Sequence, residues 1–130
     1  MRVAADTNVV VRYLTGDDAA QAAQAAVALE AADAVYLDIV VLCETVWVLR
    51  RAYGLPREQI AEVLADLLES DGIEVDSRAA DAGLAMLRAG GDFADGVILH
   101  QSGQALCGAL LTFDRRLAES GDDRVVLLTA

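Results

Sequence analysis

The chain has 130 residues, a length typical of one domain, which we expect to span residues 1–130. Hydrophobic residues make up 55% and charged residues 24%, a balance that argues against a disordered chain. No apolar run approaches the ~20 residues that a helix needs to cross a bilayer, and Asp6 comes too early for a secretory signal peptide. We therefore expect a cytoplasmic protein that does not bind membranes.

The net charge is −11, and all ten basic residues are arginines. A domain this acidic does not bind nucleic acid through its overall charge, so such a function would need metal ions or local arginines. A basic protein partner would also suit this charge. The two cysteines, Cys43 and Cys107, lie in apolar helical patterns and are expected to be reduced thiols in the core.

Short apolar runs alternate with helical patterns along the chain. In chain order we expect a strand at 3–5, helices at 9–14 and 17–32, a strand at 35–37, helices at 39–53 and 56–70, a strand at 73–75, helices at 77–89 and 92–106, a strand at 109–113, a helical turn at 115–120 and a strand at 125–128. This alternation favours a three-layer α/β/α domain with a mainly parallel sheet of four to five strands.

Three carboxylates stand at or within apolar elements. Asp6 and Asp114 each follow a strand that we expect to be buried, at the end where ligands bind in parallel sheets. Glu44 is the only charged residue between positions 39 and 49. Its neighbours at helical spacing are Val40, Val41, Trp47 and Val48. We therefore expect Glu44 to be buried, where it must bind a metal or pair with an arginine such as Arg12 or Arg51.

The segment from Gly90 to Leu99 carries two more acids at the start of a helix. Asp95 shares a helical stripe with Leu99, Ser102 and Leu106, which predicts that it points inward. The alternative is capping, with Asp92 at the N-cap and Asp95 at N3, where both favour the positive end of the helix dipole.

If the strand ends converge, four acids converge with them: Asp6, Glu44, Asp95 and Asp114. Such a cluster repels itself unless protons or cations hold it together. Oxygen ligands suit Mg²⁺ or Mn²⁺. Two such ions about 3.5–4 Å apart can activate a water and stabilise the leaving oxygen of a phosphodiester. No zinc-type spacing, P-loop, dinucleotide fingerprint or nucleophile elbow occurs, and the lone His100 is assigned no role.

The motifs that carry these acids are D-T-N at 6–8, V-V-L-C-E-T-V-W-V-L around Glu44, D-F-A-D-G-V-I-L at 92–99 and L-L-T-F-D at 110–114. Together they resemble the PIN domain over essentially the whole chain, and their order and spacing are similar to those of bacterial VapC toxins. The resemblance implies a Mg²⁺- or Mn²⁺-dependent ribonuclease that cleaves structured RNA, often loops of transfer or ribosomal RNA. It also implies a homodimer that a small VapB-type antitoxin holds inactive.

Carried over by position, the resemblance assigns Asp6, Glu44 and Asp95 to the three core acids and Asp114 to a more variable fourth. It favours Asp95 over Asp92, because the family acid directly precedes a small residue and an apolar pair. Asp92 then assists or only caps the helix.

The resemblance also assigns supporting residues around these acids. Thr7 and Asn8 are expected to orient Asp6 or the attacking water. Gly96 replaces the alanine expected after the acid, and we expect it to loosen the start of the helix.

No sequence motif identifies the residues that would contact RNA or a second copy of the chain. Candidate phosphate ligands are Arg12, Arg50, Arg51, Arg115 and Arg116, with surface or interface salt bridges as the alternative for each. The helix at 39–53 is apolar around most of its circumference, so part of it, or the segment at 9–14, could pack against a second copy. Burial under the domain's own helices is the alternative.

Three other functions compete with a nuclease. The first is a catalytically idle PIN scaffold that only binds a partner. The second is a phospho-acceptor receiver domain, which would require a lysine that this chain lacks. The third is a haloacid-dehalogenase-like phosphatase, which would require an aspartate where Asn8 stands.

Overall fold

The structure is a computed structural model that describes residues 1–129, and the chain forms two compact units. The first unit is Met1–Asp76, and the second begins at Ser77. Every helix and strand expected from the sequence is present, with ends that agree to within two residues.

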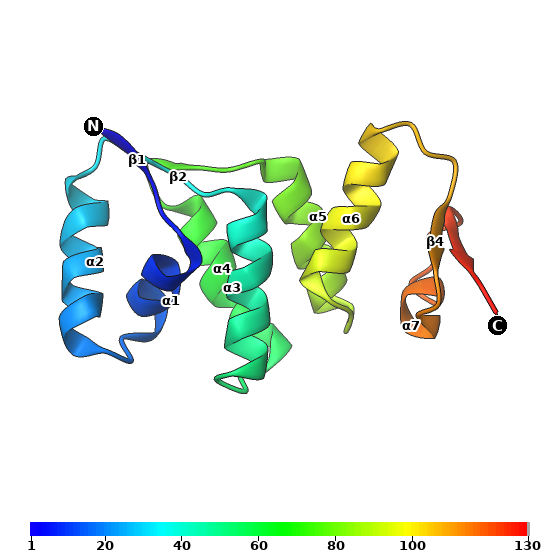
Figure 1. The fold of residues 1–130 in the computed structure, drawn as a ribbon, viewed down its shortest axis with the longest axis horizontal. Helices are drawn as coiled ribbons and strands as arrows, with labels where there is room; N and C mark the ends of the chain where they lie inside the picture. Colours follow the sequence, from blue (N-terminus) through cyan, green and yellow to red (C-terminus); the bar gives the residue numbers. More distant parts are fainter. Residues whose placement is uncertain (130) are drawn as a thin grey trace. The chain divides into compact units, whose positions relative to one another are not determined.

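The first unit contains a parallel three-stranded sheet and four helices (Figure 1). The strands β1 (Arg2–Ala4), β2 (Ala34–Tyr36) and β3 (Ile73–Glu74) lie in the order β1-β2-β3. The helices are α1 (Thr7–Thr15), α2 (Ala19–Ala31), α3 (Ile39–Arg51) and α4 (Arg57–Glu69). Both strand pairings are parallel, with Val3 opposite Val35 and Val35 opposite Ile73.

Aspartates start three of these helices, because each carboxylate accepts a backbone N–H that the first helical turn leaves without a partner. Asp18 accepts from the N–H of Gln21 at 3.0 Å, and Asp38 accepts from the N–H of Val40 at 2.8 Å. Asp6 does the same for α1. The core that these helices enclose contains fully buried apolar side chains that include Val10, Leu37, Leu42, Leu49, Ile60 and Leu64.

The second unit contains two packed helices, α5 (Ser77–Arg88) and α6 (Phe93–Gln104), and a parallel pair of strands. The strands β4 (Leu110–Thr112) and β5 (Val125–Leu127) pair with Leu111 opposite Val126, and the short helix α7 (Arg115–Ala118) lies between them in sequence. The five expected parallel strands therefore pair as a set of three in one unit and a set of two in the other.

The helices α5 and α6 approach closely because glycines stand at the contact. A Cβ atom on Gly83 would lie 2.6 Å from the ring of Phe93, and one on Gly96 would lie 2.8 Å from the Cβ of Met86. Gly96 therefore allows close packing of α6 on α5, whereas the sequence led us to expect a loosened helix start.

Burial differs from the sequence-based expectation at Glu44, which is exposed. The buried face of α3 is formed by Leu42, Thr45, Val46 and Leu49. Glu44 lies on the opposite face, where Trp47 is 63% exposed and Val40 is 60% exposed. An apolar composition did not imply burial here because a helix buries one stripe, and the residues at 40, 44 and 47 lie outside it.

Four further expectations of burial are wrong. Strand β1, at the edge of its sheet, leaves Ala4 exposed and Val3 only half-buried. Leu106 is 92% exposed, because α6 ends at Gln104 and Leu106 takes a left-handed conformation with φ of 61°, so the helical stripe does not reach it. Cys107 follows it and is exposed as well. Strand β4 exposes Leu111, because a two-stranded sheet with one short helix has too little apolar surface to cover both its faces.

No helix within residues 1–129 combines the length and the apolar character that a membrane crossing requires.

Candidate active site

Asp6 and Asp114 occupy equivalent places in the two units. Each follows a strand and caps the next helix: the Oδ1 atom of Asp6 accepts from the N–H of Val9 at 3.2 Å, and the Oδ1 atom of Asp114 accepts from the N–H of Arg116 at 2.8 Å. Within residues 1–129 the second carboxylate oxygen of each accepts no hydrogen bond. Helix capping therefore occupies one oxygen and leaves the other available to a ligand.

Glu44 is brought to Asp6 through Thr7. The hydroxyl of Thr7, in the first turn of α1, donates to the Oε1 atom of Glu44 at 3.2 Å. This bond places the Glu44 carboxylate beside the N-terminus of α1, one residue from Asp6. Neither Arg12 nor Arg51 forms a salt bridge with Glu44 among the described residues. Asn8 is exposed on the same turn.

The second unit brings three aspartates together. Asp95 is half-buried in the first turn of α6. Its pKa is raised above the usual range, first by burial and then by the negative charges of Asp92 and Asp114. Asp92 stands at the N-cap, but its side chain makes no capping hydrogen bond, and its backbone carbonyl accepts from the N–H of Asp95 at 3.1 Å.

The structure thus groups the candidate acids in two sets, Asp6 with Glu44 in the first unit and Asp92, Asp95 and Asp114 in the second. Convergence of both sets into one site stays a prediction. In neither unit do residues 1–129 contain three or more histidine, cysteine, aspartate or glutamate side chains arranged to hold a metal ion.

The donor chemistry of these residues fits Mg²⁺ or Mn²⁺. All of the candidate ligands are carboxylates, which supply the hard oxygen atoms that these cations prefer. Burial is the first cause of the raised pKa of Asp95, and the repulsion from Asp92 and Asp114 that adds to it is the kind of interaction that a divalent cation would offset.

Arg12 is engaged inside the first unit. Its guanidinium donates to the side chain of Gln21 at 2.8 Å and to the hydroxyl of Tyr53 at 3.1 Å, and that hydroxyl donates to Asp17 at 3.0 Å. This network joins α1, α2 and the end of α3. It favours an internal structural role over an RNA contact for Arg12.

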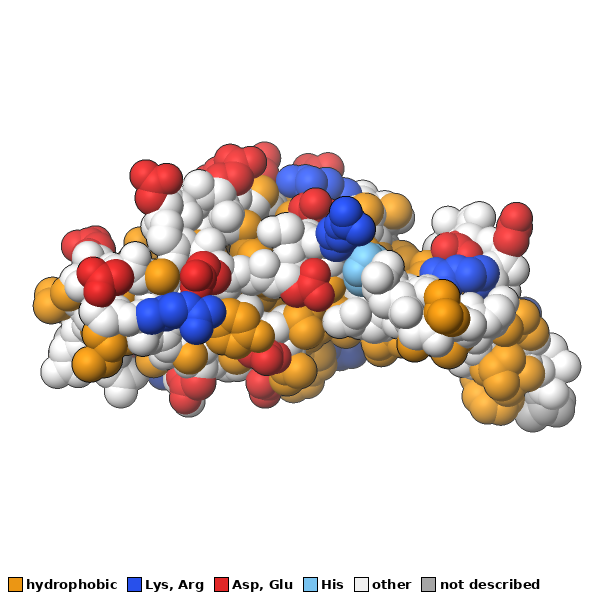
Figure 2. Space-filling model, turned by 90° about the horizontal axis from the view of Figure 1, so that it is seen from above, with side chains coloured by type: hydrophobic (Ala, Val, Ile, Leu, Met, Phe, Trp, Pro, Cys, Tyr) orange, Lys and Arg blue, Asp and Glu red, His pale blue; other side chains and the backbone are white. Residues whose placement is uncertain are grey.

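The remaining candidate arginines differ in their partners. Arg116 donates to the backbone carbonyl of Gly90 at 3.3 Å. Arg50, Arg51 and Arg115 make no side-chain hydrogen bond or salt bridge with residues 1–129. On the face seen in Figure 2, basic side chains form small separate groups among many acidic ones, without a continuous basic surface.

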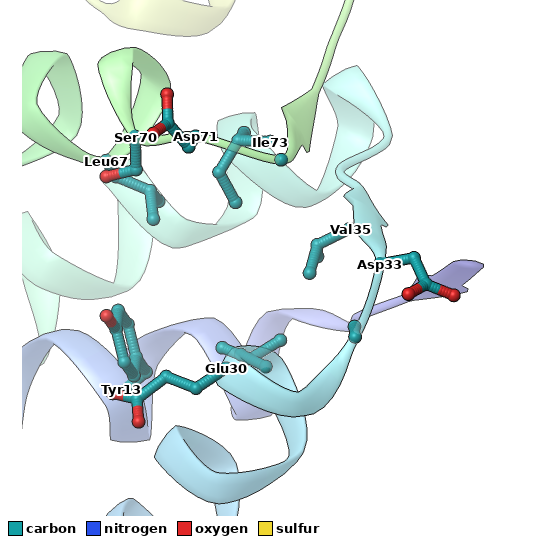
Figure 3. A pocket seen from close by; sticks show the side chains of 11 residues that line it. Tyr13, Glu30, Asp33, Val35, Leu67, Ser70, Asp71 and Ile73 are labelled. Carbon is teal, nitrogen blue, oxygen red and sulfur yellow. The ribbon is translucent and has the colours of Figure 1, made fainter. Parts of the chain in front are cut away.

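Asp6 lines a cavity of about 710 Å³ in the first unit, together with Asp38 and others. Another cavity of about 340 Å³ in the first unit is lined by Tyr13, Glu30, Val35, Leu67 and Ile73, among others (Figure 3). It lies where β2 and β3 begin, whereas Asp6 follows the end of β1.

One residue of the second unit that sequence analysis overlooked is Arg124. Its guanidinium donates to the backbone carbonyl of Leu99 at 2.9 Å, a contact between residues 25 positions apart. A side-chain contact with a distant backbone carbonyl has no sequence motif, because any residue supplies such a carbonyl.

Comparison with known proteins places this arrangement in a family. No curated protein matches the chain. The PIN domain family matches it over residues 3–122, a range that includes both sets of acids and parts of both units. This match decides against the receiver and phosphatase alternatives, and the chain belongs to the PIN domain family.

Proposed function

We propose that this protein is a Mg²⁺- or Mn²⁺-dependent endoribonuclease and the toxin of a VapBC-type toxin–antitoxin pair, which cleaves structured RNA such as loops of transfer or ribosomal RNA. PIN domains are generally nucleases, which implies a nucleic acid substrate. The resemblance of the four acid motifs to VapC toxins supports the finer assignment.

The observation that carries the proposal is the environment of Asp95. Its carboxylate is half-buried, has two like charges nearby and makes no hydrogen bond or salt bridge with residues 1–129. Such a group lowers the stability of the folded protein. Carboxylates whose pKa is raised by burial and by like charges concentrate at functional sites, where a substrate or a cation compensates them.

In this proposal Asp6, Glu44, Asp95 and Asp114 hold the metal. When bound, the ions supply an activated water and stabilise the leaving oxygen of the phosphodiester. Asp6 and Asp114 each keep one oxygen on a helix N-terminus, which fixes the direction of the other. The hydroxyl of Thr7 holds the carboxylate of Glu44 in place.

The proposed partners follow from charge and exposure. A chain with a net charge of −11 suits an antitoxin that inserts basic side chains toward the acids. Arg50 and Arg115 are better candidates for RNA phosphates than Arg12 and Arg116, whose guanidinium groups already have partners. A homodimer through the exposed face of α3 is part of the same proposal.

The test is incubation of the purified chain with cellular RNA, with Mg²⁺ or Mn²⁺ and with excess chelator. We expect cleavage only with metal. The substitutions Asp6→Asn and Asp95→Asn should each lower the rate by a factor of about 10² or more, because each removes a ligand charge from the site. Asp81→Asn, which changes an exposed aspartate of α5, is the matched control and should cleave like the wild type.

Cleavage that persists unchanged in chelator would contradict the metal mechanism. Full activity in the Asp6 or Asp95 variant would contradict the assignment of that residue. A wild type that cleaves no RNA but still captures a basic partner would support the idle scaffold instead.

A further inference from the structure

Arg124 connects α6 to the paired strands of the second unit. Its side chain, which is 32% exposed, donates to the carbonyl oxygen of Leu99 at 2.9 Å and lies 3.4 Å from the hydroxyl of Ser102. Both acceptors belong to the C-terminal half of α6. A charged donor strengthens a hydrogen bond to a neutral carbonyl, so this contact is stronger than an ordinary backbone bond.

The backbone of Arg124 connects at the same time to β4. Its carbonyl accepts from the N–H of Leu110 at 2.8 Å, at the start of the strand that leads to Asp114. The carboxylate of Asp122 accepts from the backbone N–H of Arg124 at 2.8 Å and lies 3.6 Å from its Nε atom. Asp122 thereby holds both the backbone and the side chain of Arg124 in one orientation.

Gly103 provides the space that the guanidinium occupies. A Cβ atom on Gly103 would lie 2.9 Å from the Nη1 atom of Arg124, closer than the two atoms can approach without displacement. The guanidinium stands at the end of a flexible side chain, so a methyl group at position 103 would move it at little cost to the helix.

Arg116 makes a second contact near the other end of α6. It follows Asp114 by two residues, and its guanidinium donates to the carbonyl of Gly90 at 3.3 Å, two residues before Asp92. The segment from β4 to α7, which carries Asp114, is therefore attached to the α6 region on both sides of Asp95.

We propose that Arg124, with Arg116 as a second contact, is a positioning residue that holds Asp114 near Asp95. The inference rests on the proposed function, because the two aspartates matter together only as ligands of one site. Arg124 bonds to Asp122 and to α6, and not to Asp95 or Asp114. It acts through the placement of β4, against the repulsion between the carboxylates that would otherwise separate them.

Two substitutions that disturb this contact in different ways test the proposal in the full chain. Arg124→Ala removes the donor and a charge. Gly103→Ala keeps every charge, displaces the guanidinium and favours the helix, because alanine has a higher helix propensity than glycine. Arg78→Ala, which removes an exposed arginine from the first turn of α5, is the control for charge.

The measurements are Mn²⁺ affinity by titration calorimetry, kcat and KM for RNA, and thermal stability. We expect the Kd for Mn²⁺ to rise about tenfold in Arg124→Ala and in Gly103→Ala, the effect typical of residues that orient metal ligands. The KM for RNA should not change, Arg78→Ala should match the wild type, and Gly103→Ala should melt no lower than the wild type. If Arg124 had a purely structural role, the variants would lose affinity for Mn²⁺ only to the extent that they lose thermal stability.

A double-mutant cycle with Asp114→Asn completes the test. If Arg124 acts through Asp114, then Arg124→Ala should weaken Mn²⁺ binding no further in the Asp114→Asn background. Unchanged affinity in the single variants, or losses that add in the double variant, would overturn the positioning role. A wild type that binds no Mn²⁺ would overturn the proposed function itself, and the positioning role with it.

Discussion

Asp95 stands at the third position of α6, where the helix dipole favours a negative charge. Its pKa is nevertheless raised, because burial and the charges of Asp92 and Asp114 outweigh the dipole. Asp6 and Asp114 differ from Asp95 in their hydrogen bonds, because their carboxylates accept capping bonds from backbone N–H groups. Capping alone accounts for those two positions, whereas it leaves the environment of Asp95 without an explanation.

The pH dependence of stability tests this difference in the metal-free chain. A carboxyl whose pKa is higher in the folded state than in the unfolded state lowers stability as the pH rises, because the folded state then loses its more tightly held proton. The loss begins near the unfolded pKa of about 3.9 and is complete above the raised folded value. We therefore expect the stability of Asp95→Asn relative to wild type to increase as the pH rises through this range, as measured by chemical denaturation.

Helix capping predicts the opposite sign for the same experiment. Loss of a favourable charge at a helix N-terminus would destabilise Asp95→Asn by about 0.3–1 kcal/mol, and only above the pH at which Asp95 ionises. Asp81→Asn, at an exposed position of α5, controls for removal of any carboxylate. A variant that becomes less stable than wild type as the pH rises would identify Asp95 as a cap.

At the scale of elements, α3 has two apolar faces with different environments. One face is buried in the first unit through Leu42, Val46 and Leu49. The other exposes Val40 and Trp47 on either side of Glu44. Tryptophan is enriched among the residues that anchor protein interfaces, so Trp47 is the candidate anchor of this face.

We expect Trp47→Glu to shift the proposed homodimer to monomer at tens of micromolar, as measured by light scattering. The charge would be costly in an apolar interface and harmless on an exposed surface. Val27→Glu, which changes an exposed valine of α2, is the matched control and should leave the dimer intact. A monomeric wild type at these concentrations, or a dimer that tolerates Trp47→Glu, would contradict an interface on this face.

At the scale of the whole molecule, the chain has 21 acidic residues, 10 arginines and no lysine. Repulsion among these charges destabilises the folded state, and salt screens it. We expect the Tm of the metal-free chain to rise with NaCl, and MnCl₂ at equal ionic strength to raise it further, because binding to the folded state adds about 2.7 kcal/mol when the ion is at 100 times its Kd.

The additional rise in Tm that Mn²⁺ binding causes should be absent in Asp95→Asn. The Tm of this variant should depend on ionic strength alone. The comparison is made by calorimetry at several salt concentrations, each with and without Mn²⁺. Equal responses to the two salts in the wild type would mean that Mn²⁺ only screens charge.

The sequence by itself determined the elements and the candidate acids. Aspartates before helical patterns predicted the starts of α2 and α3, because capping is a local interaction between neighbours in the chain. The order of the acid motifs likewise predicted the PIN domain, which the family match confirms. Local patterns and motif order are both readable without knowledge of distant contacts.

Only the tertiary structure decided which faces are buried and which distant groups meet. Glu44 has apolar neighbours in sequence, yet it lies on the exposed face of α3, because packing selects one stripe of a helix. Gly96 is important because α5 packs closely against it, and Arg124 is important because it donates to the carbonyl of Leu99. No sequence pattern predicts either contact. Burial and long-range hydrogen bonds depend on how elements are placed against each other, and that placement is a property of the folded chain.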